Sequence, residues 1–143
     1  MYKKILVAID FSDTSPKVIE RALELAGDTA RLELVHGVEP IPTVWGMESY
    51  AMDPTELQEK ILSSAGESLA ELAGKYGIKA EKQHIVLGSP ATEIRVLQEK
   101  LGADAIVIGS HGHSGWKLIL GATANKLLHG AKCDVLTVFV GKD

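Results

Sequence analysis

Short apolar runs alternate with amphipathic segments along the whole chain. Continuous apolar runs rich in β-branched residues are typical of strands that are buried on both faces of a sheet. Between the runs, apolar residues recur at spacings of three and four, which is typical of helices that bury one face. The predicted strands are Ile5–Ile9, Leu32–Val38, Ala80–Leu87, Ala103–Ile108 and Asp134–Val140. This alternation predicts an α/β fold, a doubly wound five-stranded parallel sheet with helices on both faces.

Several helix boundaries can be predicted from capping residues. Asp53-Pro54-Thr55-Glu56 is typical of a helix start, with a capping Asp, Pro at the first position and Glu at the third. Ser89 precedes Pro90 in the same way, and Gly77 and Gly102 are predicted helix ends. The long connection 39–52 joins the second strand to the helix that starts after Asp53, and connections of this length are often functional or mobile.

Composition and charge narrow the class of protein. The 143 residues are 45% hydrophobic and 24% charged, which predicts a single domain, 1–143, with a sizeable core. The net charge of −4 and the lack of basic runs disfavour nucleic acid or an anionic membrane as a partner. No apolar run approaches the ~20 residues that span a bilayer. The single cysteine, Cys133, fits a reducing compartment, so we expect a cytoplasmic protein.

Topology predicts where a ligand would bind. In doubly wound sheets, ligands bind beyond the carboxyl ends of the strands, where successive connections leave to opposite faces. If the first and fourth strands are neighbours, Ala8–Asp13 and Gly109–Thr123 meet at that point. The second segment is rich in glycine and opens a helix at Gly121-Ala122-Thr123, and backbone N–H groups at a helix start bind phosphate. A phosphate loop and a plain turn are equally compatible with this pattern, because it contains no Walker A and no GxGxxG motif.

Other candidate groups allow a functional and a structural interpretation. Asp10 could contact a ligand or cap the helix after it. His111 and His113 form an H-x-H pair near His129 and Cys133, but the spacing does not favour zinc, so no metal site is predicted.

The remaining candidates favour structural roles. Cys133 precedes an apolar strand and is expected to be buried and unreactive. His36 and His84 lie on predicted strands and are interpreted as structural. Ser110 lacks the G-x-S-x-G context of a hydrolase nucleophile. No catalytic residue is therefore predicted, and we expect that the protein is not an enzyme.

Three stretches of the chain carry a family resemblance. KKILVAIDFS, LELVHGVE and DAIVIGSHGHSGWKLILGATANKLLHGAKCDVLTVFV resemble the universal stress protein family, of the UspA type, and the likeness extends over essentially the whole chain. The resemblance implies the strand order 3-2-1-4-5. It also implies a homodimer, which we expect to form through the apolar last strand, 134–140. A charge on this strand, as in Val138→Lys, should then weaken the dimer if that side chain faces the partner.

One branch of the family binds ATP through the motif G-x2-G-x9-G-(S/T). Gly109 and Gly112 match its first half. Eight residues, His113–Leu120, then separate Gly112 from Gly121, and Ala122 stands where a hydroxyl is expected, with Thr123 next. Another branch has the shorter spacing and is regarded as not binding ATP, so the resemblance leaves both possibilities open.

The nucleotide-binding interpretation assigns a set of contact residues. Residues at the ends of the first two strands would flank the adenosine, the start of the fourth connection would approach the ribose and phosphates, and the next helix start would cradle the phosphates. These residues are Ala8, Ile9, Asp10, Gly37, Ile108, Gly109, His111, Gly112, Gly121, Ala122, Thr123 and Ala124.

We expect a cytoplasmic stress-response regulator. A likeness to the ATP-binding branch would add that it binds ATP or AMP, with Mg²⁺ as the companion ion. The alternatives are a dimeric interaction protein with a vestigial, empty site and, less favoured, a weak ATPase.

Overall fold

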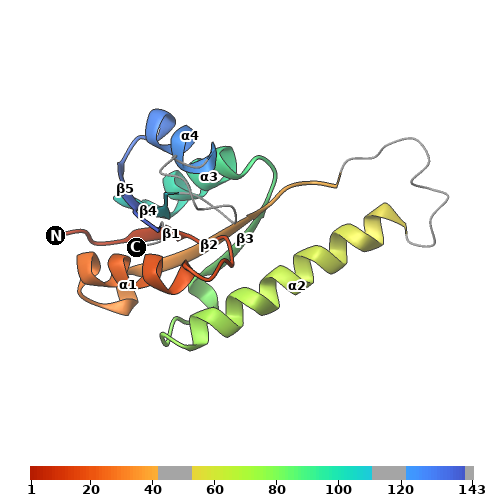
Figure 1. Ribbon diagram of the computed structural model, residues 1–143, viewed down its shortest axis with the longest axis horizontal. Coiled ribbons are helices and arrows are strands. Elements are labelled where there is room, and N and C mark those ends of the chain that lie inside the picture. Colours follow the sequence, from red (N-terminus) through yellow and green to blue (C-terminus); the bar gives the residue numbers. More distant parts are fainter. Residues whose placement is uncertain (42–52, 111–121, 141–143) are drawn as a thin grey trace.

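A computed structural model describes residues 1–41, 53–110 and 122–140. Within these ranges, five parallel strands form one sheet in the order β3-β2-β1-β4-β5 (Figure 1). The first strand, β1, lies between β2 and β4, with Ala8 paired to both Val35 and Ile108. The strands are β1 (Ile5–Ala8), β2 (Leu32–Val38), β3 (Gln83–Leu87), β4 (Ala105–Gly109) and β5 (Asp134–Val138). The predicted fold class and strand order are confirmed.

The helices cover both faces of the sheet, as predicted. In Figure 1, α1 and α2 lie on one face, and α3 and α4 lie on the other. The first half of α2 extends past the edge of the sheet. The helices are α1 (Ser15–Ala26), α2 (Pro54–Gly74), α3 (Pro90–Leu101) and α4 (Ala122–Gly130), and two 3₁₀ turns, η1 (Thr29–Arg31) and η3 (Ala80–Lys82), precede β2 and β3. None of the described helices is long and apolar enough to cross a bilayer.

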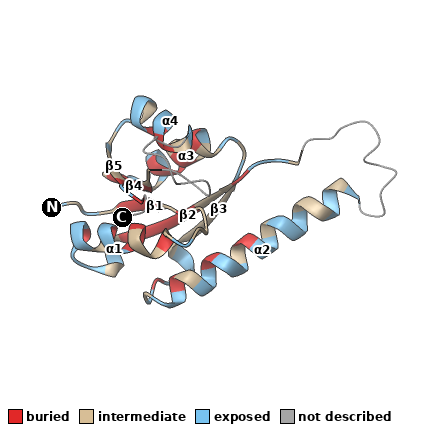
Figure 2. Ribbon diagram, in the orientation of Figure 1, coloured by how far each residue is buried: buried red, intermediate tan, exposed pale blue. Residues whose placement is uncertain are grey.

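The central strand shows why its sequence is apolar throughout. Ile5 and Val7 pack in the cluster under α1 and α2, whereas Leu6 packs in the cluster under α3 and α4. All three side chains are fully buried, and Figure 2 shows the central strands as the most buried part of the molecule. Because successive side chains of a strand point to opposite faces, a strand covered on both sides must be apolar at every position.

The capping predictions at the helix ends are mostly confirmed. The Asp53 carboxylate accepts a hydrogen bond from the Thr55 N–H at 3.1 Å. Ser89 occupies the N-cap position of α3 without a side-chain hydrogen bond. Gly102 ends α3 with a φ of 69°, a left-handed conformation that favours glycine. Gly77 also has a positive φ, but α2 already ends at Gly74.

Some strand boundaries differ from the prediction. The third strand begins at Gln83 and not at Ala80, because Ala80–Lys82 is polar, partly exposed and wound into η3. The fourth strand begins two residues later than predicted, at Ala105, because the Asp104 carboxylate turns to accept the N–H groups of Lys3 and Lys4. β1 ends at Ala8, one residue early.

The last strand forms an edge of the sheet. β5 ends at Val138, although Val140 is also buried. Val138 is 5% exposed and belongs to the cluster under α1, so it faces the core and not solvent. The condition under which Val138→Lys was expected to weaken the dimer, a side chain that faces the partner, is therefore not met. The exposed apolar side chains here are Leu136, at 39%, and Phe139, at 46%.

Candidate functional site

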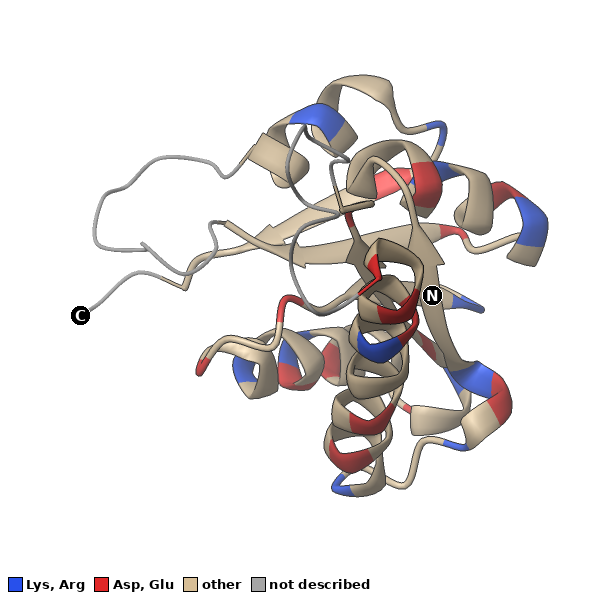
Figure 3. Cartoon of the chain, turned by 90° about the vertical axis from the view of Figure 1, so that its right-hand side faces the viewer, with Lys and Arg blue, Asp and Glu red and all other residues tan. Residues whose placement is uncertain are grey.

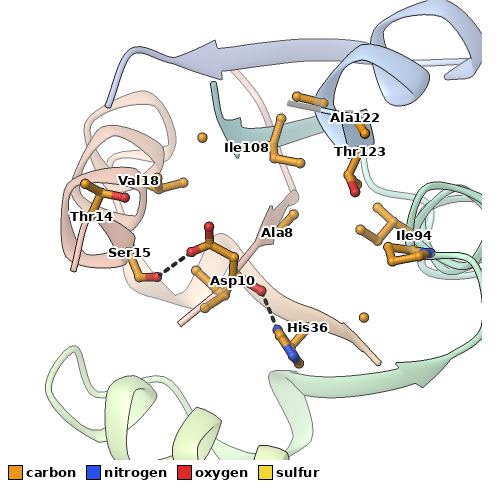
Figure 4. Close-up of a pocket in the computed structure, with 15 residues that line it drawn as sticks. Ala8, Asp10, Thr14, Ser15, Val18, His36, Ile94, Ile108, Ala122 and Thr123 are labelled. Carbon is orange, nitrogen blue, oxygen red and sulfur yellow. Dashed lines mark hydrogen bonds between the residues drawn. The ribbon is translucent and has the colours of Figure 1, made fainter. Parts of the chain in front are cut away.

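A cavity of about 300 Å³ lies at the carboxyl edge of the sheet, where β1 ends between β2 and β4 (Figure 4). The connection after β1 leads to α1 on one face of the sheet, whereas the connection after β4 leads to α4 on the other face. The cavity therefore lies at the crevice between β1 and β4 where topology predicted a ligand site. The cavity is lined by Ala8, Ile9, Asp10, Thr14, Ser15, Val18, His36, Gly37, Pro90, Ile94, Ile108, Gly109, Ala122, Thr123 and Ala124.

Nine of the twelve predicted contact residues line this one cavity. They come from the ends of β1, β2 and β4 and from the first turn of α4. The other three, His111, Gly112 and Gly121, lie outside the described residues. The structure therefore brings together the predicted segments whose positions it describes, although Ala8 and Ala124 are 116 positions apart in the chain.

Asp10 holds the turn that leads from β1 into α1. Its Oδ1 atom accepts hydrogen bonds from the Ser12 backbone N–H at 2.9 Å and from the Ser15 hydroxyl at 3.3 Å. Ser15 is 3% exposed, so its hydroxyl depends on such a partner. The Asp10 carboxylate also borders the cavity (Figure 4). The capping role expected as one alternative is therefore present, and the carboxylate is placed where it could also contact a ligand.

His36 borders the cavity as well, which the sequence did not indicate. Its Nδ1 atom lies 2.6 Å from the carbonyl oxygen of Ile9. A carbonyl oxygen only accepts hydrogen bonds, so this contact assigns the Nδ1 proton. The imidazole also stacks on the Phe11 ring, with centroids 4.1 Å apart. Phe11 has a φ of 61°, which is uncommon for a bulky residue. The ring of His36 thus has the structural role that was expected and a place at the cavity that was not.

Gly37 allows β2 to approach the start of α3. A Cβ atom at this position would lie 3.0 Å from Cβ and 3.2 Å from Cα of Pro90. Both distances are tighter than ordinary contacts, so any larger residue would push β2 and α3 apart. The absence of a side chain at Gly37 therefore sets the width of the cavity between these two elements.

The helices supply most of the cavity residues that sequence reasoning missed. Thr14, Ser15 and Val18 belong to the start of α1, and Pro90 and Ile94 belong to the first turns of α3. Each of these helices follows a strand directly, so its first turn lies at the same edge of the sheet. The strand order and the predicted helix starts together would have identified these residues as neighbours of the site.

The charge around the cavity is low. Asp10 is the only carboxylate among the described lining residues, which include no Lys and no Arg. Figure 3 shows the described Lys and Arg residues spread among Asp and Glu over the helices, while α2 carries mostly acidic side chains. An anion in the cavity would therefore depend on backbone N–H groups and hydroxyls among these residues.

The zinc and thiol interpretations can be compared with the described residues. Those residues contain no group of three potential ligands, and His111 and His113 lie outside them. His129 contacts the Asn125 carbonyl oxygen through Nδ1 at 2.8 Å. Burial, followed by the nearby charges of Asp134 and Asp104, raises the pKa of the Cys133 thiol. Cys133 is half-buried and not fully buried as expected, but the direction of this pKa shift fits an unreactive thiol.

Comparison with known proteins identifies the family. A model of the universal stress protein family matches residues 1–138. Universal stress protein A homolog 1 of Coxiella burnetii is 41% identical over 140 residues, which cover 97% of each chain. Universal stress protein G of Shigella flexneri is 32% identical over 142 residues, covering 96% of this chain and 99% of that protein.

Solved structures share the fold. The structure of hypothetical protein MJ0577 has a TM-score of 0.77 at 25% identity and covers 100% of this chain and 99% of its own. A universal stress protein in complex with cAMP has a TM-score of 0.54 at 21% identity, covering 96% and 97%, and shows a likeness of fold alone. Together with the matched sequence and strand order, these relatives show that the chain belongs to the universal stress protein family.

Proposed function

We propose that this protein is a cytoplasmic stress-response regulator that holds an adenine nucleotide, ATP or AMP, in the cavity at the end of β1. The observation that carries the proposal is the convergence of predicted contact residues from β1, β2, β4 and α4 on one cavity of about 300 Å³. A volume of this size lies at the small end of the range for small-molecule sites. The cytoplasmic location rests on the single cysteine of the sequence.

The cavity has the chemistry that a nucleotide requires. Ile9, Ile94 and Ile108 provide apolar surface for a planar base. On the α4 side, the first N–H groups of the helix lack intrahelical partners and attract phosphate, and the Thr123 hydroxyl lies beside them (Figure 4). Asp10 can accept ribose hydroxyls. It is also an oxygen ligand of the kind that Mg²⁺ prefers.

The same residues support binding without turnover. Phosphoryl transfer relies on cations that neutralise charge as it develops, and the described lining residues include no Lys or Arg. The Oδ1 atom of Asp10 already accepts two hydrogen bonds. We therefore expect phosphate release below about one per minute, against ~10 per second for a median enzyme.

A second candidate function, a dimeric interaction protein with an empty cavity, is favoured by the edge of the sheet. β5 carries exposed Leu136 and Phe139, and an apolar edge strand needs cover. A second copy of the chain that adds its own strand there is the simplest cover. The homodimer is part of both candidates, and occupancy of the cavity distinguishes them.

The deciding experiment is to purify the protein natively, analyse the small molecules extracted from it, and titrate ATP and AMP by calorimetry. We expect micromolar affinity, which corresponds to about 7–8 kcal/mol. Ala122 is exposed at the start of α4 and lines the cavity, so Ala122→Phe should fill the site and weaken binding about tenfold or more.

The matched control is Ala70→Phe, the same change on the exposed side of α2, which should leave binding unaltered. Absence of both heat and a melting shift at millimolar ATP and AMP would refute the nucleotide proposal and leave the interaction protein.

A further inference from the structure

A second hollow, which we call the α2 groove, lies between the end of β2 and the helix α2. Its volume is about 760 Å³. It combines apolar side chains with a polar rim, and it shares His36 and Gly37 with the nucleotide cavity. The α2 groove is lined by Phe11, His36, Gly37, Val38, Glu39, Lys60, Ile61, Ser64, Ala65 and Ser68.

The His36 ring stands between the two hollows. Its neighbours on β2 pair with β3, which fixes the backbone, and its Nδ1 atom is held 2.6 Å from the Ile9 carbonyl oxygen. Phe11, which lines the α2 groove but not the cavity, stacks on the imidazole. Figure 4 shows His36 at the margin of the cavity that faces α2. The imidazole, held by this hydrogen bond and this stacking contact, therefore separates the cavity from the α2 groove.

The position of the His36 ring determines which end of a bound nucleotide it would contact. The phosphate-binding groups proposed above lie at the start of α4, which borders the cavity together with Ile108 and Gly109 at the end of β4. His36 and Gly37 lie on β2, on the opposite side of β1. A nucleotide whose phosphates meet α4 therefore extends across the end of β1, and its base reaches His36.

We propose that His36 is a specificity residue that sets how large a base the cavity accepts. The inference rests on the proposed nucleotide function and adds a chemical limit to it. Plain adenine nucleotides fit against the imidazole, whereas nucleotides with a bulky substituent on the base edge collide with it. Removal of the imidazole joins the cavity to the α2 groove, which then has room for the substituent.

The test compares ATP with N6-benzyl-ATP by calorimetry in the full chain. The unaltered protein should prefer ATP by about tenfold or more. In His36→Ala, the ratio of the affinity for ATP to the affinity for N6-benzyl-ATP should fall by about tenfold, or the preference should reverse. The matched control is His84→Ala, which removes an imidazole from the neighbouring strand β3, where it lies 2.8 Å from Glu33 and lines neither hollow. It should leave the ratio unchanged.

A second variant tests whether the benzyl group enters the α2 groove. Ile61 lines that groove but not the cavity, and it is 38% exposed, so a lysine there is compatible with the fold. His36→Ala combined with Ile61→Lys should lose the gained binding of N6-benzyl-ATP and retain ATP. Phe11→Ala keeps the imidazole but removes its stacking partner, and it should shift the ratio in the same direction by a smaller factor.

The outcomes separate the two proposals. An unchanged ratio in folded Phe11→Ala and His36→Ala, with ATP still bound, overturns the role of His36 and leaves the nucleotide function standing. If His36→Ala does not fold, an unchanged ratio in Phe11→Ala is sufficient to overturn it. A protein that binds neither compound overturns both proposals.

Discussion

Replacing Asp10 by alanine should destabilise the protein even without a ligand. The Oδ1 atom of Asp10 accepts the Ser12 N–H at 2.9 Å and the Ser15 hydroxyl at 3.3 Å, and together these bonds fix the turn between β1 and α1. Alanine removes the one oxygen that accepts both bonds. The Ser15 side chain is nearly inaccessible to water, so its hydroxyl would lose a partner that solvent cannot easily replace.

The size of the effect follows from these two contacts. A hydrogen bond to a charged acceptor contributes about 1.5–3 kcal/mol, and the longer bond to Ser15 should lie at or below the lower end of that range. Because Asp10 is only half-buried, we expect a loss of about 2 kcal/mol in the free energy of unfolding. For a chain of this size, that loss lowers Tm by about 6 °C. Asp10→Asn retains an oxygen at the Oδ1 position and should lose less than about 1 kcal/mol.

Thermal and urea denaturation of the ligand-free variants measure the effect. Asp13→Ala removes an exposed carboxylate from the same turn, outside this hydrogen-bond network, and should change stability by less than about 0.5 kcal/mol. If Asp10→Ala were as stable as Asp13→Ala, or if Asp10→Asn were as unstable as Asp10→Ala, the capping argument would fail. ATP titration of Asp10→Asn then isolates a ligand contact, because this variant keeps the turn and loses the charge.

Three further predictions concern the edge strand, the thiol and the behaviour in acid. Leu136→Lys should weaken self-association, measured by light scattering, and keep the fold, whereas Val138→Lys should unfold the monomer because Val138 lies in the core. If the unaltered protein is a monomer at concentrations on the order of tens of micromolar, the dimer is refuted. Because burial raises its pKa, Cys133 should be alkylated at pH 7 more slowly than a cysteine peptide, and an equal rate would contradict this. The N–H groups of Lys3 and Lys4 lower the Asp104 pKa, so its stabilising contribution is present above the ordinary pKa of about 3.9 and is lost as pH falls below that value. Asp104→Asn should therefore lower Tm at pH 7 more than at pH 3, and equal losses would argue against it.

The fold could be predicted from the sequence because its central strand, β1, is apolar at every position. Leu6 shows the reason: it lies in a run with no polar position, and such a run suits only a strand covered on both faces. The predicted boundaries were wrong where local contacts compete with strand pairing. Ala80–Lys82 winds into a 3₁₀ turn, and Asp104 turns to accept two N–H groups from the segment before β1. Neither contact is visible in the hydrophobic pattern.

The candidate site was predicted in part. The strand ends were found because topology fixes where parallel strands terminate, and the start of α4 was found because it follows a glycine-rich loop. His36 was not connected with the site, because its role depends on the Ile9 carbonyl group and the Phe11 ring, about 25 residues earlier in the chain. Gly37 was assigned to the site from the family resemblance, but its close approach to Pro90 depends on packing that no local pattern encodes.

The cavity itself results from unequal strand lengths. β1 ends at Ala8, opposite Val35 and Ile108, whereas β2 continues for three more residues to Val38, paired with β3. The central strand thus stops before its neighbour, and the recess above it is walled by the continuing end of β2. Asp10 contributes to this arrangement because its hydrogen bonds turn the chain out of the sheet and into α1. The residue that turns the chain out of the sheet therefore also borders the recess beyond β1, which is why a role in folding and the proposed role in binding fall on one carboxylate.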